Sequence, residues 1–172
     1  DPDAIAKTAE QLAAVMDTSG DIDNKLNACL ALCYLKSSYS DYVTNTVKEL
    51  AQSADTLIGE AAKDKNSSFR QTSAVYAIIA RLYMESDDND TAMSWINKTS
   101  ENLLSDDDLV LKAKIAGNLS DYSTAKRNYS AVLTRNENST SALIGMIQSS
   151  VDEQLTAGSR NFAEAQTLIA RL

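Results

Sequence analysis

Glycine and proline are scarce in this chain, whose 172 residues include five glycines and a single proline. Tight turns between long strands depend on these residues, so their scarcity disfavours a β-rich fold. Alanine and leucine are plentiful instead, and these residues favour helix. The sequence therefore predicts an all-α chain.

Capping residues precede stretches in which apolar side chains recur with a helical period. They are Asp3, Asp21, Asp41, Ser68, Asp90, Asp106 to Asp108, Asp121, Ser139 and Asn161. About nine helices are expected, over residues 3–16, 23–36, 41–62, 69–86, 90–103, 107–117, 122–135, 140–155 and 161–171. Because short polar links join them, neighbouring helices are expected to form antiparallel hairpins.

An internal repeat of about 33 residues becomes visible when the predicted helices are aligned,. Large, small and aromatic side chains recur in one order. The copies consist of Tyr76, Ile79, Ala80, Tyr83, Ala92 and Ile96; of Leu109, Ala113, Ala116, Tyr122, Ala125 and Tyr129; of Leu143, Met146, Ile147, Phe162, Ala165 and Ile169; and of Leu30, Ala31, Tyr34, Val43 and Val47. Small residues such as Ala80, Ala113, Ala125 and Ala165 predict close contact between helices, with Tyr83 or Tyr129 filling the space beside them,.

This repeat resembles the tetratricopeptide repeat (TPR) family over residues 24–172, most clearly in YAIIARLY, DNDTAMSWI and DYSTAKRNYSAVL. The resemblance implies a right-handed solenoid of antiparallel helical hairpins within a single domain, 1–172. An extra helix at 1–22 would precede hairpin repeats at 23–65, 66–105, 106–139 and 140–172. The chain departs from the family pattern where Ser105 and Glu137 replace the closing proline, where Lys112 replaces a core leucine, and where residues 51–65 are inserted. The alternative to a TPR domain is therefore a related, TPR-like helical-hairpin solenoid.

In the TPR family the first helix of each pair lines a concave groove that binds a peptide or protein segment. The resemblance implies that the exposed positions of these first helices bind the partner. In this chain the corresponding candidate residues are Lys25, Lys36, Arg81, Met84, Lys114, Asn118 and Gln148. Arg81, Lys114 and Gln148 recur at intervals of about one repeat,. They would form a column of donors suited to an acidic or carboxylate-bearing peptide. The alternative is that these residues are ordinary solvated helix positions.

TPR co-chaperones hold a carboxylate at places that are apolar in this chain. Those places carry Ala28, Cys29, Ala77, Ile78, Val110 and Leu111. A chaperone-tail receptor is therefore not expected. The apolar character of these places favours an apolar helix or extended segment as an alternative occupant, supplied by a partner or by the chain itself.

Charge and composition argue against several function classes. The formal net charge of −8 disfavours nucleic acid as a partner,. Without histidine or a glycine-rich phosphate loop, no catalytic residue, metal site or cofactor is expected. The acidic runs 86–90 and 106–108 lack the glycine and terminal glutamate of an EF-hand loop, so they are interpreted as helix caps.

The two cysteines, Cys29 and Cys33, stand four residues apart in a predicted helix and are expected to be reduced core residues,. Reduced thiols favour the cytoplasm slightly, whereas the acidic, Ser/Thr/Asn-rich composition is equally compatible with the periplasm or secretory pathway after signal removal. The longest apolar run, 28–35, is far shorter than the roughly 20 residues that span a bilayer,. Membrane insertion is not expected.

These observations predict a non-catalytic scaffold or adaptor that binds a peptide or protein segment in a concave groove. The alternative is a structural or self-associating segment of a longer solenoid in a multi-subunit assembly.

Overall fold

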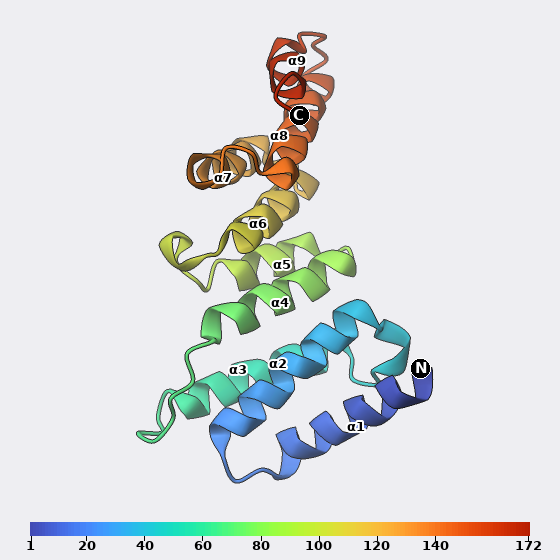
Figure 1. The fold of residues 1–172 in the computed structure, drawn as a ribbon, viewed down its shortest axis with the longest axis vertical. Helices are drawn as coiled ribbons and strands as arrows, with labels where there is room; N and C mark the ends of the chain where they lie inside the picture. Colours follow the sequence, from blue (N-terminus) through green and yellow to red (C-terminus); the bar gives the residue numbers. More distant parts are fainter. The chain divides into compact units, whose positions relative to one another are not determined.

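The computed structural model describes residues 1–172 and contains only helices (Figure 1). It has nine α-helices, two 3₁₀ turns and no strand, so the predicted all-α class and number of helices are confirmed. The α-helices are α1 (Pro2–Thr18), α2 (Ile22–Ser38), α3 (Val47–Ala61), α4 (Thr72–Glu85), α5 (Asn89–Ile96), α6 (Asp106–Asn118), α7 (Tyr122–Arg135), α8 (Thr140–Thr156) and α9 (Ala163–Ile169). The 3₁₀ turns are η1 (Ser40–Tyr42) and η2 (Glu101–Leu103).

Side-chain caps begin several helices where the sequence predicts them. The Asp21 carboxylate accepts a hydrogen bond from the Asp23 amide at 2.9 Å at the start of α2. Ser105 and Asp108 form a reciprocal capping box at the start of α6. The sequence predicts Asp106 to Asp108 as the caps of this helix, but Ser105 is the cap and the three acids form the first turn of α6. Their carboxylates lie at the positive end of the helix dipole.

Helix α3 begins later than its predicted range of 41–62. Asp41 lies in η1, and α3 begins at Val47. The Thr46 amide donates to the Glu49 carboxylate at 2.8 Å, and the Glu49 amide donates to the Thr46 hydroxyl at 3.2 Å. This capping box satisfies two backbone donors at once and is a stronger start signal than a single acidic cap.

Helix α5 ends earlier than its predicted range of 90–103. It stops at Ile96, and the chain continues through non-helical backbone into η2. Ser, Thr and Asn occupy most of 97–102, and these side chains disfavour helix interiors because they bond to nearby backbone groups. The Glu101 carboxylate also lies 2.8 Å from the Lys112 ammonium, which holds η2 against α6.

The chain divides into two compact units, Asp1–Asp88 and Asn89–Leu172. Unit 1 contains α1 to α4, and unit 2 contains α5 to α9. The two helices of the predicted repeat 66–105 therefore fall in different units. The assignment of 1–172 to a single domain stays a prediction.

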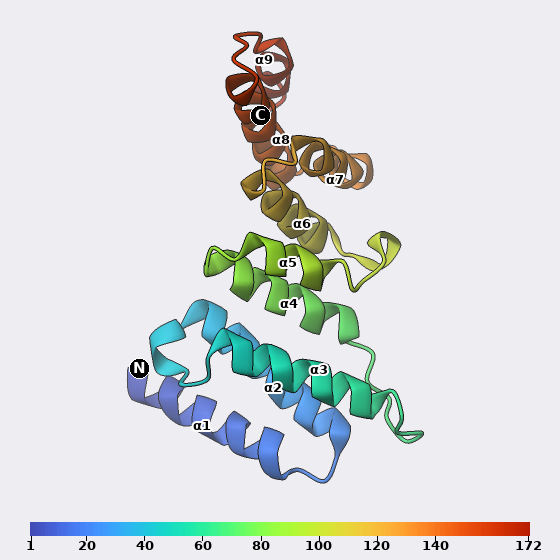
Figure 2. The ribbon, with the colours of Figure 1, turned by 180° about the vertical axis from the view of Figure 1, so that it is seen from behind.

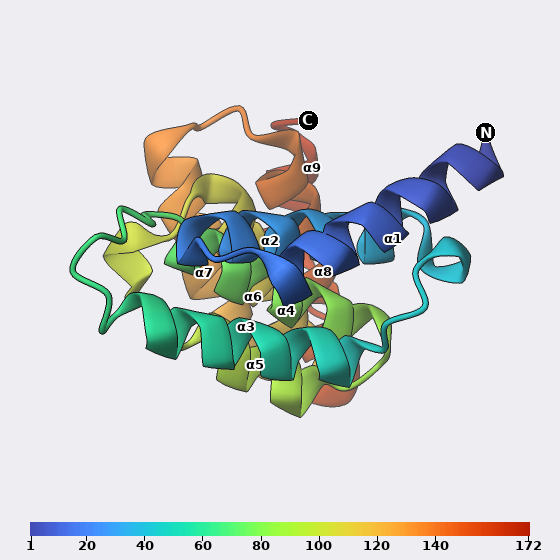
Figure 3. The same ribbon diagram turned by 90° about the horizontal axis from the view of Figure 1, so that it is seen from below.

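Helix α2 is the central helix of unit 1. It packs against α1, α3 and α4, and α3 also packs against α4. Figure 2 shows α3 lying across α2, and Figure 3 shows the two helices side by side. The fully buried side chains of α2 are Leu26, Cys29, Leu32 and Cys33. Together with the buried Ala28 and Leu30, they cover about half of the circumference of the helix. This wide buried surface suits α2 to contact with three neighbours.

The two cysteines are free and buried in α2, as predicted. The Cys29 thiol donates to the Leu50 carbonyl oxygen of α3 at a sulfur–oxygen distance of 3.9 Å. A side-chain hydrogen bond with Cys29, together with burial, raises the pKa of the Cys33 thiol. Cys33 therefore stays protonated at neutral pH and behaves as an apolar core residue.

Unit 2 builds successive helices onto one another. Helix α6 packs against α5 and α7, α8 packs against both α6 and α7, and α9 packs against α8. The small residues Ala113 and Ala116 of α6 and Ala125 of α7 are fully buried. Small side chains let helix backbones approach closely, as the sequence predicts.

Gly145 of α8 lies directly against the aromatic ring of Tyr129 of α7. A Cβ atom added at Gly145 would overlap that ring. Burial of Tyr129 raises the pKa of its phenol to about 12. Tyr129 is thus a buried aromatic residue beside a small one, as the repeat predicts, but the small residue in contact with it is Gly145 and not one of the alanines.

Lys112 occupies a buried position on α6, at the place where the TPR pattern has a leucine. Its side chain is only 7% exposed, and its ammonium lies 2.8 Å from the Glu101 carboxylate. Arg127 lies 3.1 Å from the same carboxylate oxygen. The hydrogen bond from Lys112, with smaller contributions from Arg127, lowers the pKa of Glu101. The buried ammonium is thus paired, as burial of a charge requires.

Candidate functional site

The seven predicted groove residues lie on four helices. They are Lys25 and Lys36 on α2, Arg81 and Met84 on α4, Lys114 and Asn118 on α6, and Gln148 on α8. The predicted column has Arg81 in unit 1 but Lys114 and Gln148 in unit 2. Its continuity along one surface therefore stays a prediction.

Lys36 is occupied by bonds to the main chain. Its ammonium donates to the carbonyl oxygens of Ser40 and Val43, at 3.2 and 2.9 Å. These bonds tie the last turn of α2 to η1 and place a cation at the negative end of the helix dipole. Lys36 thus stabilises the end of α2.

Two of the predicted residues in unit 2 also bond to their own unit. The Asn118 amide donates to the Asn89 side-chain oxygen at 2.9 Å. The Gln148 amide donates to both oxygens of Asp152, at 2.9 and 3.0 Å. A partner would have to replace these bonds in order to use the two amides.

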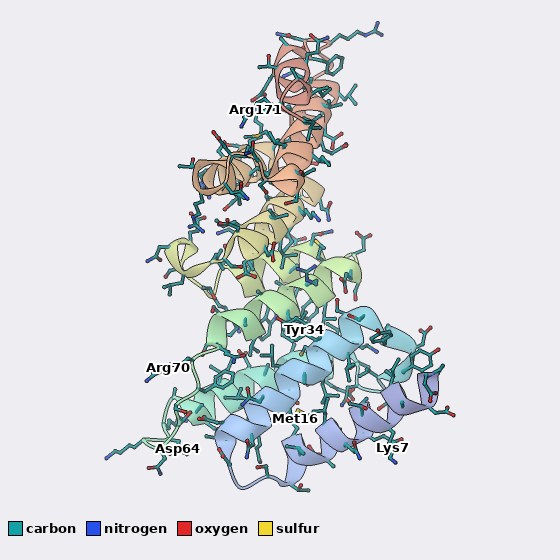
Figure 4. The ribbon with its side chains drawn as sticks, viewed as in Figure 1. Lys7, Met16, Tyr34, Asp64, Arg70 and Arg171 are labelled. Carbon is teal, nitrogen blue, oxygen red and sulfur yellow. The ribbon has the colours of Figure 1, made fainter.

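An open groove with a volume of about 410 Å³ lies in unit 1 where α1, α2 and α3 meet. Lys25 is the predicted site residue that lines it. The other lining residues are Met16 and Asp17 of α1, and Glu49, Gln52, Ser53, Thr56, Leu57 and Glu60 of α3. Figure 4 shows Met16 between α1 and α2.

One face of α3 forms the polar wall of this groove. Its residues recur three to four positions apart, so they lie on the same side of the helix. They are Glu49, Gln52, Ser53, Thr56 and Glu60. The buried residues of α3 are Leu50, Ala51, Ala54 and Leu57. Packing of this apolar side on unit 1 turns the polar side toward the groove.

The groove is lined by three carboxylates and one ammonium. Hydrogen bonds from Thr46 lower the pKa of Glu49 and hold its carboxylate at the start of α3. The side chains of Asp17, Glu60 and Lys25 make no hydrogen bond or ion pair within the structure. These three charged groups are therefore available to a ligand.

The chemistry of the groove is that of a binding surface. Met16 and Leu57 are largely buried and supply an apolar base. Carboxylate, amide and hydroxyl groups from α1 and α3 surround them. Apolar contact area with a few polar groups around it is typical of sites that bind a ligand or a protein segment.

Sequence reasoning found Lys25 but missed the other lining residues. It assigned the binding surface to the first helix of each pair, whereas most of this groove belongs to α3. The signal in the sequence was the polar stripe from Glu49 to Glu60. That stripe alone does not reveal a groove, because solvated helix faces have the same spacing.

No three or more Cys, Asp or Glu side chains come close enough together to hold a metal ion. Likewise, each of the nine helices is either too short or too polar to cross a membrane.

Comparison with family models, with curated proteins and with solved structures finds no match to this chain.

Proposed function

We propose that this chain is a non-catalytic protein-interaction module, a scaffold or adaptor, whose unit 1 groove binds an extended segment of another protein. The observation that carries the proposal is the open groove formed by three helices and lined by Asp17, Lys25 and Glu60. Because these charged groups make no bond within the structure, a partner can bind them without breaking contacts of the fold.

We also infer that the helical hairpins are of TPR type and stack with a right-handed sense. The packing within each unit supports this: α2 packs against α3 and α4, and α6 packs against α7 and α8. Stacked hairpins produce this order of contacts. A crystal structure tests the inference, and left-handed stacking or a closed bundle would contradict it.

The composition of the groove favours a segment in which a basic side chain neighbours an apolar one. Asp17 and Glu60 offer carboxylates to a lysine or arginine, and such charge-assisted bonds are strong. Met16 and Leu57 offer apolar surface to the neighbouring residue. The expected occupant of this groove therefore differs from the acidic peptide predicted for the column of Arg81, Lys114 and Gln148.

The test is an NMR titration of the isotope-labelled chain with two libraries of short peptides. One library carries a fixed leucine and lysine two positions apart, and the other carries glutamate in place of the lysine. We expect the lysine library to shift the amide signals of Lys25, Ser53 and Thr56, and the glutamate library to have a weaker effect. If neither library shifts these signals, the proposal fails.

The matched variant is the double substitution Asp17→Asn and Glu60→Gln, which keeps the shape of both side chains and removes their charges. Losing one charge-assisted bond costs about 1.5–3 kcal/mol, so we expect affinity for the lysine library to fall at least tenfold. Glu10→Gln is the control, because Glu10 is an exposed carboxylate of α1 outside the groove. Equal binding by the double variant and the control would contradict the assignment of the site.

A further inference from the structure

The buried lysine of α6 departs from the pattern of the repeat. The corresponding positions one repeat earlier and one repeat later carry Ile79 and Met146, whose side chains are buried. Lys112 is buried as well. An apolar side chain at such a place often stabilises a fold as well as a buried ion pair does, so packing alone does not account for the lysine. Residues that break a local pattern in this way are typical of functional sites.

Lys112 lines a pocket within unit 2 that has a volume of about 230 Å³. The other lining residues include Met93 and Leu119, which supply apolar surface, and Arg127 of α7, which supplies a second cation. Sites for drug-sized ligands have volumes of roughly 300–1,000 Å³. This pocket is smaller, so it suits a molecule of only a few carbon atoms.

Two cations converge on one carboxylate oxygen beside this pocket. The Lys112 ammonium lies 2.8 Å from an oxygen of Glu101, and the Arg127 guanidinium lies 3.1 Å from the same oxygen. Glu101 belongs to the η2 turn, and its side chain is half exposed. The contacts of Glu101 thus show how these two cations hold a carboxylate group.

The carboxylate that lines the pocket itself is already stabilised at the start of α7. Asp121 accepts a hydrogen bond from the Thr124 amide at 3.0 Å. This bond lowers the pKa of Asp121, and the positive end of the helix dipole stabilises its charge further. Lys112 and Arg127 are therefore the groups of the pocket that suit an added anion.

We propose that this pocket binds a small free carboxylic acid with a short apolar stem, whose carboxylate replaces that of Glu101 at Lys112 and Arg127. The exchange substitutes one carboxylate for another, so the buried ammonium is also paired in the bound state. The apolar stem lies against Met93 and Leu119, and the Glu101 side chain turns into water. None of these residues lines the unit 1 groove, so this site and segment binding can fail independently.

The test is an NMR titration of the isotope-labelled chain with sodium isovalerate, a carboxylate on a short branched hydrocarbon. We expect saturable shifts of the amide signals of Asn97, Leu119 and Thr124, which line the pocket. Isovaleramide has the same shape without the charge and should cause no saturable shift. The tripeptide Gly-Gly-Leu carries a similar carboxylate and stem at the end of a peptide and should bind more weakly than isovalerate.

Three variants test the assigned residues. Glu101→Gln weakens the internal competitor for the two cations and should raise the affinity for isovalerate, a gain that a purely structural ion pair would not produce. Arg127→Gln removes an exposed cation and should lower the affinity at least tenfold, because a hydrogen bond to a charged group is lost. Lys112→Met should abolish binding while circular dichroism shows an unchanged fold, since apolar residues occupy the corresponding positions of the other repeats.

Arg135→Gln is the matched control, because Arg135 is an exposed arginine of α7 that pairs with Asp106 outside the pocket. It should bind isovalerate like the unmodified chain. The proposal is overturned if isovalerate causes no saturable shift, if isovaleramide binds equally well, or if Arg127→Gln and Arg135→Gln bind alike. Tighter binding of the tripeptide than of isovalerate would overturn the assignment to a free acid.

Discussion

The helices of the two units contact one another in a similar order, but different kinds of side chain stabilise these contacts in each unit. Unit 1 is built on aliphatic and thiol groups of its central helix α2, such as the fully buried Leu32 and Cys29. Unit 2 fits the Tyr129 ring against Gly145 and buries Lys112 beside Glu101. The same stacking of helices can therefore rest on apolar volume in one unit, and on shape and charge pairing in the other.

The two units also differ in whether their charged side chains are paired within the structure. Ion pairs within unit 2 engage Lys112, Lys126, Arg127 and Arg135. In unit 1, Asp17, Lys25 and Glu60 line the groove without bonds to the rest of the structure. A partner that binds a charged group already paired within the fold must break that pairing, which costs free energy. The segment binding that we propose is therefore placed in unit 1.

The largest effect is expected from Leu32→Ala, which removes volume from the core of unit 1. Leu32 is completely buried, and large-to-small substitutions at such sites lower the free energy of unfolding by about 2–5 kcal/mol. Urea denaturation followed by circular dichroism measures the loss. Leu103→Ala is the control, because Leu103 is 67% exposed in η2. Equal decreases in the free energy of unfolding for the two variants would contradict the view that the buried side chains of α2 stabilise unit 1.

Gly145→Ala tests the close fit in unit 2. The added methyl group overlaps the Tyr129 ring, so we expect the free energy of unfolding to fall by about 1–3 kcal/mol. Gly117→Ala on α6 is the matched control, because open space surrounds Gly117 and alanine favours helix by about 0.5–1 kcal/mol. The fluorescence of Trp95, the single tryptophan, reports on unit 2. A stabilising effect of both substitutions would contradict the contact.

The smallest effect is expected at the pair formed by Lys112 and Glu101. Glu101→Gln leaves a buried ammonium with a weaker acceptor and should lower the free energy of unfolding by about 1–2 kcal/mol near neutral pH. Lys112→Met removes the buried charge and places an apolar side chain at this buried position. It should be neutral or stabilising. Urea denaturation at pH 7 distinguishes the two variants.

The pH dependence of the free energy of unfolding is an independent test of the pair formed by Lys112 and Glu101. The bond from Lys112 lowers the pKa of Glu101 in the folded state. The contribution of this bond to the free energy of unfolding is therefore fully present above the unfolded-state pKa of about 4.3. It is lost as the pH falls through the lower pKa of the folded state. In Lys112→Met the main cause of the lowered pKa is gone, so stability should fall less steeply between about pH 5 and pH 3. Identical slopes for this variant and the unmodified chain would contradict the pairing.

Local patterns were sufficient to predict most of the fold. Caps such as Asp21 and Asp121 act on nearby backbone amides, so they could be recognised in the sequence. The errors arose where local signals competed: the capping box at Thr46 replaced Asp41 as the start of α3. Both signals are present in the sequence, and the box of Thr46 and Glu49 satisfies two backbone donors where Asp41 alone would satisfy one,.

The amino-acid sequence was enough to establish the helices, the reduced cysteines and the unusual lysine at a core position, because each depends on neighbouring residues or on a repeated pattern. The groove in unit 1 and the contact of Gly145 with Tyr129 required the folded chain. Both join residues of different helices, whose relative rotation and distance depend on the packing of all their side chains together. The sequence of a polar stripe or of a single glycine is the same whichever way the helix faces. Only the packing of the helices determines which residue of another helix lies against it.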